Sequence, residues 1–291
     1  WNRSVLDRAV KRSLEKADTT RPSIAHSGVA PHFPQLDGTD SHLWFGWENG
    51  DISDLNVLAS RLPRLVRFVS EFGAQALPAD AEIAEACGAS NFPQIDTEVL
   101  ANDFGAQLEL LGQHTPINEA GSWDEWVHQT QLRQAEVLRH TIEMLRTLKY
   151  RPTGGFCQFM FADALPFISC SVLDHQRRPK KAWDALSAAN RPVIVVADLH
   201  QNALTTQRHK CAIHVVSDLR TNVGPATLTV EWRAPAMQPQ RWVFAGDFEP
   251  DSVTKVAEPI LVADNPGMAS LALELRGPEV HAVNLYQIKV C

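Results

Sequence analysis

One glutamate lies at the end of a predicted strand, which is where enzymes built on a parallel barrel carry their catalytic residues. Ser70-Glu71-Phe72-Gly73 follows directly on Leu65–Val69, an apolar run interrupted only by Arg67, which predicts a strand. Side chains at the C-terminal ends of barrel strands face the active site, whereas those at the opposite ends serve stability. A carboxylate in that position can act as a nucleophile or transfer a proton. Glu71 is therefore the first candidate catalytic residue, and the alternative is an ordinary surface carboxylate.

The segments around Glu71 alternate between short apolar strands and helical patterns, which is typical of βα units around a parallel sheet. Strands are predicted at Ser23–Ser27, His42–Trp47, Leu65–Val69 and Phe156–Phe161. Helices are predicted in the opening segment with Val5, Leu6, Ala9, Val10 and Leu14, and at Ser53–Leu62, Asp96–Leu111, Trp123–Lys149 and Pro179–Ala189. Residues 1–190 are thus expected to form part of an α/β barrel of the TIM type.

Helical spacing disappears from Pro192 onward, and only strand patterns remain. Seven short segments are separated by Pro, Gly, Asn and Asp turns: Val193–Leu199, Cys211–Leu219, Ala226–Trp232, Arg241–Phe244, Val253–Ala257, Ser270–Leu275 and Ala282–Ile288. This pattern predicts a second, all-β domain over residues 191–291. We expect an immunoglobulin-like β-sandwich without the disulfide of antibody domains.

The charge, the hydropathy pattern and the cysteines of the sequence argue against several classes of partner and cofactor. The 291 residues carry a formal charge of −7 with no long Lys/Arg cluster, so nucleic acid is not an expected partner. No apolar run approaches the roughly 20 residues that cross a membrane. The five cysteines are scattered without metal-ligand spacing, and no phosphate loop or dinucleotide fingerprint is present, so neither a metal nor a cofactor is expected. A first residue of Trp suggests that the natural start lies upstream.

Several sequence motifs together resemble those of glycoside hydrolase family 2, in particular its β-mannosidase branch. Arg67-Phe68-Val69-Ser70-Glu71-Phe72-Gly73-Ala74-Gln75 is similar to the family's R-F-x-S-E-[YF]-G-x-Q element. The resemblance continues over nearly the whole chain through Arg21-Pro22, Asp37 to Trp47, Gln129, Gln134-Ala135, Glu143, Arg146, Lys149, Thr153 to Gln158, Asp174, Arg178-Pro179-Lys180 and Asn284-Leu285-Tyr286.

The resemblance implies a retaining exo-β-glycosidase in which Glu71 is the nucleophile. It places the four predicted strands as the fifth to eighth of an eight-stranded barrel, with Glu71 ending the seventh. Retaining glycosidases need two carboxyl groups about 5–5.5 Å apart. The family's acid/base glutamate would lie before Trp1, so the missing N-terminal part of the same protein is an expected partner. Asn118-Glu119 is a less favoured substitute because it falls in a linker.

The expected substrate is a carbohydrate with a terminal β-linked sugar. Side chains that could orient Glu71 or contact that sugar are His42, Trp47, Ser70, Gln75, Gln158 and Asp163. The alternative role for His42 is a buried imidazole on a strand. Trp44 and Trp47 are equally consistent with packing in the core and with a platform on which a sugar ring stacks. Asp163 falls two residues later than the family's aspartate.

Because of departures from the family pattern, the sequence does not determine which sugar is bound. Cys157, Leu165 and Cys170 stand where the family commonly has tryptophans, so part of its aromatic sugar platform is absent. Another family 2 activity, such as β-glucosaminidase or β-galactosidase, is therefore an alternative. A non-catalytic carbohydrate-binding or scaffold protein that uses residues 191–291 is a third. Half a barrel has free strand edges, so the isolated chain is expected to be inactive and prone to aggregation.

Overall fold

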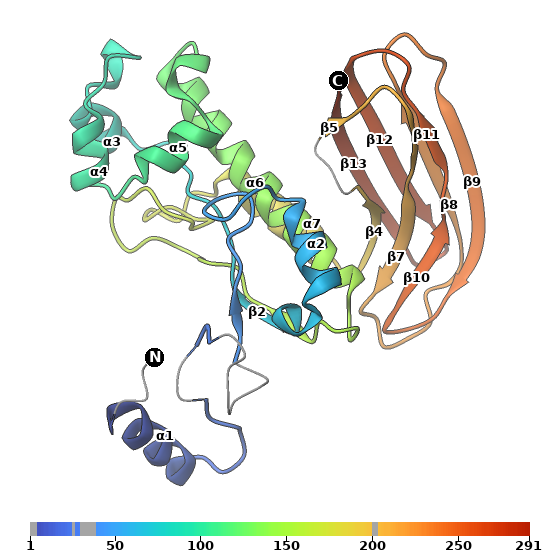
Figure 1. Cartoon of the computed structure of the whole chain (residues 1–291), viewed down its shortest axis with the longest axis horizontal. Coiled ribbons are helices and arrows are strands. Elements are labelled where there is room, and N and C mark those ends of the chain that lie inside the picture. The colour runs from blue at the N-terminus through green and yellow to red at the C-terminus, as the bar shows by residue number, and fades with distance from the viewer. Residues whose placement is uncertain (1–4, 25–26, 30–38, 200–202) are drawn as a thin grey trace.

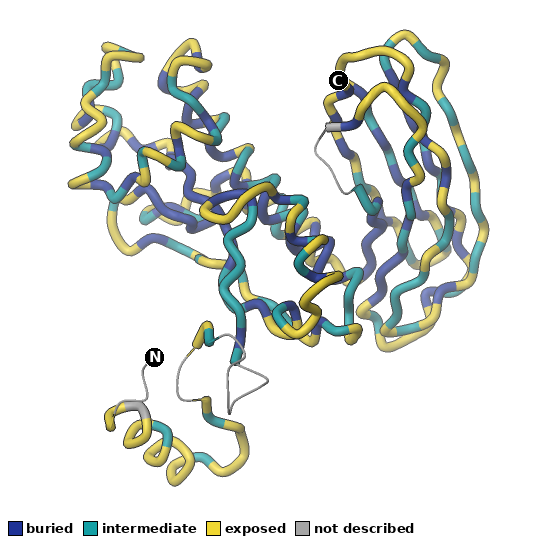
Figure 2. Tube along the Cα trace, in the orientation of Figure 1, coloured by how far each residue is buried: buried dark blue, intermediate teal, exposed yellow. Residues whose placement is uncertain are grey.

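The structure is a computed structural model that describes residues 5–24, 27–29, 39–199 and 203–291. A helical region with a small sheet and a region of long strands lie side by side, and the long helix α6 (Trp123–Thr147) lies between them (Figure 1). Helix α1 (Val5–Ala17) stands apart from both at one end of the molecule. Its apolar stripe follows the predicted spacing, yet Val5, Leu6, Val10 and Leu14 are all exposed (Figure 2).

A three-stranded parallel sheet lies at the centre of the helical region. Its order is β1 (Ser41–His42), β2 (Phe68–Glu71), β3 (Gly155–Phe156). The pairs His42↔Glu71 and Val69↔Phe156 set the register. Within the described residues no sheet closes on itself, so the structure does not confirm a partial barrel.

The strands around Glu71 are shorter than predicted. His42–Trp47 is wrong as a strand beyond His42, because the chain turns through Gly46, whose φ of +79° ends the extended run. Phe156–Phe161 is likewise wrong beyond Phe156, where the backbone turns into an irregular loop. The predicted strand Ser23–Ser27 lies partly outside the described residues.

Helices cover one face of this sheet. Helices α2 (Asp54–Arg61), α6 and α7 (Lys181–Ala189) pack on it through a core that includes Leu55, Val69, Phe72, Leu138, Ile142, Leu145 and Ala182. The α6 helix begins where Ser122 accepts a hydrogen bond from the Glu125 N–H at 3.2 Å, as the capping-box spacing predicts. Burial of this apolar face fixes β2 against α6 and so fixes the position of Glu71.

A second helical layer follows Glu71 in the chain. It consists of α3 (Ala81–Ala86), α4 (Thr97–Asn102) and α5 (Leu108–His114), with Asp80 and Asp96 as N-caps of the first two. The single predicted helix Asp96–Leu111 is wrong: Gly105 has a φ of +73°, which breaks the helix into α4 and α5.

Two antiparallel sheets share one core in the C-terminal region. The first sheet has the order β10 (Ser252–Ala257), β7 (Ala212–Ser217), β4 (Val193–Asp198). The second has the order β5 (Ala203–Leu204), β13 (His281–Val290), β12 (Gly267–Arg276), β8 (Gly224–Arg233), β9 (Gln240–Phe248). Within the second sheet, only the β5–β13 pair is parallel. Alternate residues are buried between the sheets, among them Leu228, Trp232 and Leu273. All seven predicted segments contain strands. A short pair, β6 (Arg208–Lys210) with β11 (Ile260–Val262), and β5 were not predicted.

A buried polar cluster joins α6 to this strand region. Glu143 accepts hydrogen bonds from Asn284 Nδ2 at 2.7 Å and from the Tyr286 hydroxyl at 2.8 Å. The Tyr286 hydroxyl also accepts the Ala197 N–H at 3.1 Å. Burial raises the pKa of Glu143 above its usual range, although nearby Arg139 and the two hydrogen bonds act in the opposite direction. This cluster therefore gives α6 one fixed position on the sheets.

We expect Tyr286→Phe to lower the free energy of unfolding by about 1–3 kcal/mol, because it leaves the buried Glu143 carboxyl and the Ala197 N–H each without one partner. Urea unfolding followed by tryptophan fluorescence measures the change. Tyr150→Phe is the matched control, since Tyr150 is 63% exposed. Equal stability losses in both variants would contradict the prediction.

Candidate active site

Glu71 lies at the C-terminal end of the central strand of the small sheet. Its backbone carbonyl accepts the Leu43 N–H at 2.9 Å, which continues the pairing with β1 beyond His42. Its side chain is 30% exposed. The carboxylate is thus held by a packed strand and still reachable from solvent, as a group that attacks a bound substrate must be.

His42 links Glu71 to a second carboxylate. Nδ1 of His42 lies 3.2 Å from Glu71 Oε2, and Nε2 lies 3.0 Å from Ser27 Oγ and 3.6 Å from Asp40 Oδ2. Gly28 approaches the ring so closely that a Cβ there would lie 2.8 Å from it, and its φ of +69° suits glycine. Residues 27–29 therefore wrap the imidazole and orient it toward Glu71.

Asp40 is the buried carboxylate on the side of His42 opposite Glu71. Its carboxylate accepts hydrogen bonds from the hydroxyls of Ser27 and Ser70 and from the Gly28 N–H at 3.1 Å. Burial alone would raise the pKa of Asp40, but these three hydrogen bonds outweigh burial and hold the pKa well below its usual range. Ser70 thus supports Asp40, where the sequence predicted that it would orient Glu71 or hold sugar hydroxyls. Sequence reasoning gave Asp40 no role, although it stands two residues before His42.

We expect Asp40→Asn to destabilise the protein by about 1–3 kcal/mol at pH 7, because Asn cannot accept all three hydrogen bonds. A carboxyl with a lowered folded pKa stabilises the fold above its unfolded pKa of about 3.9, and that contribution is lost as the pH falls toward the folded value. The gap between wild type and Asp40→Asn should therefore shrink below pH 4. Urea unfolding at pH 7, 5 and 3 measures it, with exposed Asp264→Asn as the control; a gap that does not change with pH would contradict the assignment.

The other side of Glu71 is formed by the chain after β3. Backbone hydrogen bonds from Cys157 N–H to Val69 O (2.8 Å) and from Phe159 N–H to Phe72 O (2.9 Å) place Gln158 beside the end of β2. The Oε1 atom of Gln158 is buried without a hydrogen-bond partner among the described residues, so its capacity to accept a hydrogen bond is unused. The ring of Phe159 meets Trp44 edge to face, with centroids 5.6 Å apart.

Three predicted substrate contacts lie inside the protein. Trp47 is 2% exposed and donates from Nε1 to Gln107 Oε1 at 2.7 Å. Gln75 is 8% exposed, donates to Gly105 O and accepts the Gln107 N–H. Asp163 is 3% exposed. Because these side chains are buried and already hydrogen-bonded, we leave all three out of the candidate site.

The structure therefore brings together Glu71, His42 and Ser70, and sets Gln158 beside them. Asn118-Glu119 lies in a 3₁₀ turn (Ile117–Glu119) between α5 and α6, as the linker prediction implied. Glu119 lines a groove of about 1080 Å³ between the helices and β12–β13, whose lining does not include Glu71.

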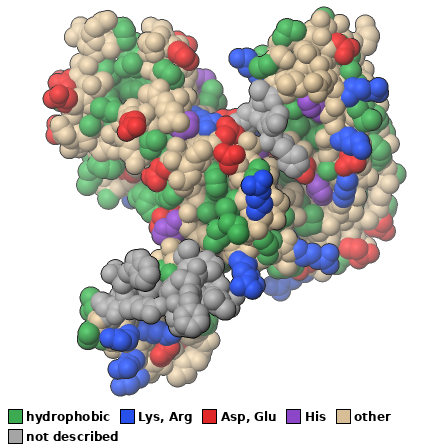
Figure 3. Space-filling view, viewed as in Figure 1, with side chains coloured by type: hydrophobic (Ala, Val, Ile, Leu, Met, Phe, Trp, Pro, Cys, Tyr) green, Lys and Arg blue, Asp and Glu red, His purple; other side chains and the backbone are tan. Residues whose placement is uncertain are grey.

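The visible surface carries charges of both signs. On the face shown in Figure 3, acidic and basic side chains are interspersed over both regions, while basic ones gather on α1, which holds Arg8, Lys11, Arg12 and Lys16. Within the described part of the chain, no helix has the length and apolar character needed to cross a membrane. In the same residues, no group of three or more His, Cys, Asp or Glu side chains is arranged to hold a metal ion.

Comparisons with known proteins agree with the fold. No protein-family model and no curated protein matches the chain. The structure is similar to the β-D-mannosidase of Dictyoglomus thermophilum, with a TM-score of 0.74 and 18% identity over 99% of this chain and 35% of that one. It is also similar to the exo-chitosanase CsxA of Amycolatopsis orientalis, with a TM-score of 0.66 and 16% identity over 98% of this chain and 35% of that one.

Both neighbours are members of glycoside hydrolase family 2, so the resemblance seen in the motifs is confirmed at the level of the fold. This chain spans about a third of the length of these two proteins. At 16–18% identity the likeness concerns the fold, and function has to be argued from the site.

Proposed function

We propose that this chain carries the catalytic nucleophile, Glu71, of a retaining exo-β-glycosidase. The observation that carries the proposal is the partly exposed Glu71 carboxylate at the C-terminal end of the central parallel strand, with His42 Nδ1 3.2 Å away. The fold supports it, because two glycosidases share that fold over 98–99% of this chain.

In the proposed reaction, a Glu71 oxygen attacks the anomeric carbon of the terminal sugar. The bond from that carbon to the leaving oxygen breaks, and an acid protonates the leaving oxygen. Water then attacks the glycosyl ester, releasing the sugar and restoring the carboxylate. Two inversions return the β-configuration to the product.

His42 has a defined part in this scheme. Ser27 donates its only proton to Asp40, so Ser27 Oγ can accept from His42 Nε2. With Nε2 held in this way, His42 Nδ1 lies 3.2 Å from Glu71 Oε2 and orients the carboxylate.

The acid comes from elsewhere in the same protein under this proposal. The resemblance places it before Trp1, together with four strands that would complete a barrel of which β1, β2 and β3 form part. The edges of β1 and β3 and the 45% exposed ring of Phe68 offer the surface that such strands would cover. We propose residues 1–190 as the barrel portion and residues 191–291 as an immunoglobulin-like sandwich that supports it. We call the protein with its proposed N-terminal part the assembled enzyme.

The sugar is proposed to be a β-mannoside. A β-linked glucosamine is the second candidate, because the exo-chitosanase shares the fold with a TM-score of 0.66, close to the 0.74 of the mannosidase. A panel of nitrophenyl β-glycosides assayed on the assembled enzyme separates the two.

Covalent trapping tests the nucleophile directly. A 2-fluoro glycosyl fluoride of the preferred sugar slows both chemical steps, but its good leaving group allows the first, so the glycosyl ester accumulates. Peptide mass spectrometry should find the label on Glu71 and none in Glu71→Gln. Labelling of another carboxylate, or inactivation without any label, would refute the proposal.

A further inference from the structure

The chain between β3 and α7 folds back on itself beside Glu71. We call residues 157–174 the return loop. Within it the Met160 N–H donates to Cys170 O at 3.2 Å, and the Leu173 N–H donates to Phe161 O at 3.0 Å. The loop carries Gln158 to the strand end but contains no helix or regular strand among its described residues. Its shape must therefore depend on side-chain contacts.

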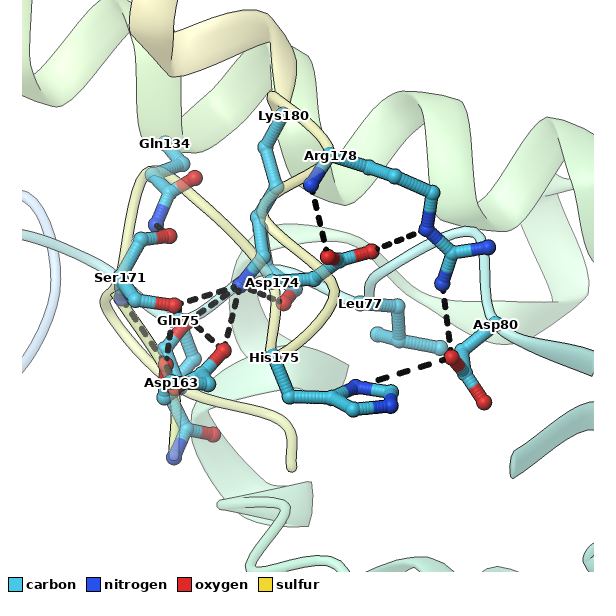
Figure 4. A network of polar contacts seen from close by, with 12 residues as sticks. Gln75, Leu77, Asp80, Gln134, Asp163, Ser171, Asp174, His175, Arg178 and Lys180 are labelled. Carbon is cyan, nitrogen blue, oxygen red and sulfur yellow. Dashed lines mark hydrogen bonds and ion pairs between the residues drawn. The ribbon is translucent and has the colours of Figure 1, made fainter. Parts of the chain in front are cut away.

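Lys180 supplies the central contact from inside the protein. Its side chain is 1% exposed, and Nζ donates to Ala76 O at 3.0 Å and to Ser169 O at 3.3 Å. Nζ also lies 3.4 Å from Ser171 Oγ and 3.8 Å from Asp163 Oδ2 (Figure 4). One ammonium thus ties both branches of the return loop to the segment that follows Glu71.

Asp163 is the matching charge in the loop. Its two carboxylate oxygens accept from Ser169 Oγ at 2.6 Å and from Ser171 Oγ at 2.5 Å. The backbone carbonyl of Asp163 accepts from Arg177 at 2.7 Å. A buried ammonium and a buried carboxylate, each hydrogen-bonded on several sides, tolerate few alternative arrangements of the loop.

The same site joins the loop to the end of β2. The Ala76 N–H donates to Ser169 O at 3.0 Å, and Gln134 of α6 donates from Nε2 to both Ala74 O and Ser171 O. Gln134 is fully buried. The segment three to five residues after Glu71 and the return loop are therefore held by one polar network.

We propose that Lys180 and Asp163 are positioning residues of the active site, which hold the return loop so that Gln158 stays beside the end of β2 that carries Glu71. This inference rests on the proposed function. Neither residue touches the sugar; they act through the loop. Asp163, which the sequence predicted as a substrate contact, thus serves the site from inside the protein.

Lys180→Met in the assembled enzyme tests the inference with two readouts. Amide hydrogen exchange at Met160, Asp163 and Leu173 should rise about tenfold or more, while amides of β12 and β13 stay unchanged. At a temperature where the protein is fully folded, kcat should fall about 100-fold, with a smaller change in KM, because the bound sugar loses its aligned partner. Lys181→Met, the same change at the exposed neighbouring residue, is the control.

The double variant Asp163→Asn/Lys180→Met keeps the test decisive if the single variant folds poorly. It should recover part of the exchange protection, because no unpaired carboxylate is left in the buried site. Unchanged loop exchange, uniformly faster exchange, or no recovery in the double variant would overturn the inference. A normal kcat in Lys180→Met would also overturn the inference, but it would leave the role of Glu71 intact. Unchanged activity of the Glu71→Gln enzyme would instead refute the proposed function. In that case the exchange data would still show whether Lys180 holds the return loop.

Discussion

Glu71→Gln in the assembled enzyme is expected to lower kcat/KM by about 10⁴-fold or more on the preferred nitrophenyl β-glycoside, because the amide cannot form the glycosyl ester. Size and hydrogen-bonding shape are nearly kept, so the fold should be unaffected. The side chain is 30% exposed and its removal leaves no buried charge unpaired. The loss should therefore appear in kcat, with circular dichroism and thermal unfolding unchanged.

Glu48→Gln provides the matched control, since Glu48 belongs to the neighbouring turn after β1 and has no assigned role in the mechanism. Its activity should stay within about twofold of wild type. If Glu71→Gln kept more than a tenth of wild-type activity, Glu71 would not be the nucleophile, and a non-catalytic carbohydrate-binding protein would become the better explanation.

The sequence predicted the parts of the fold that local pattern determines. Amphipathic spacing and the Ser122 cap located α6, and short segments between Pro, Gly, Asn and Asp turns located the seven main strands after Pro192. Three short strands were missed because two or three residues carry no period. The break at Gly105 was missed because helical spacing continues through it on both sides.

The sequence predicted which side chains of the candidate site meet only where their positions follow from strand direction. Glu71 and His42 end neighbouring parallel strands, so their meeting follows from topology. Trp47, Gln75 and Asp163 were assigned to the substrate, but their burial depends on α5, on Gln107 and on Lys180, which approach from distant parts of the chain. Polar type alone cannot distinguish a residue that binds a ligand from one that satisfies the backbone.

Gly73 shows how closely the return loop approaches the strand that carries Glu71. A Cβ placed on Gly73 would lie 2.5 Å from the backbone oxygen of Phe159, a distance that real Cβ atoms do not reach. The obstructing atom belongs to the backbone, so no flexible side chain can move aside. Gly73→Ala must therefore displace the return loop, including Gln158, relative to Glu71.

We expect Gly73→Ala to lower kcat of the assembled enzyme by about 100-fold, because a shift near 1 Å at a catalytic site costs that much. The free energy of unfolding should fall by about 1–3 kcal/mol from overpacking. Gly112→Ala is the matched control: it is exposed on α5, a Cβ there meets nothing within 4 Å, and it should keep full activity with equal or slightly higher stability. Wild-type kcat in Gly73→Ala would mean that the loop can move without disturbing the chemistry, and Gln158 would then have no part in holding the sugar against Glu71.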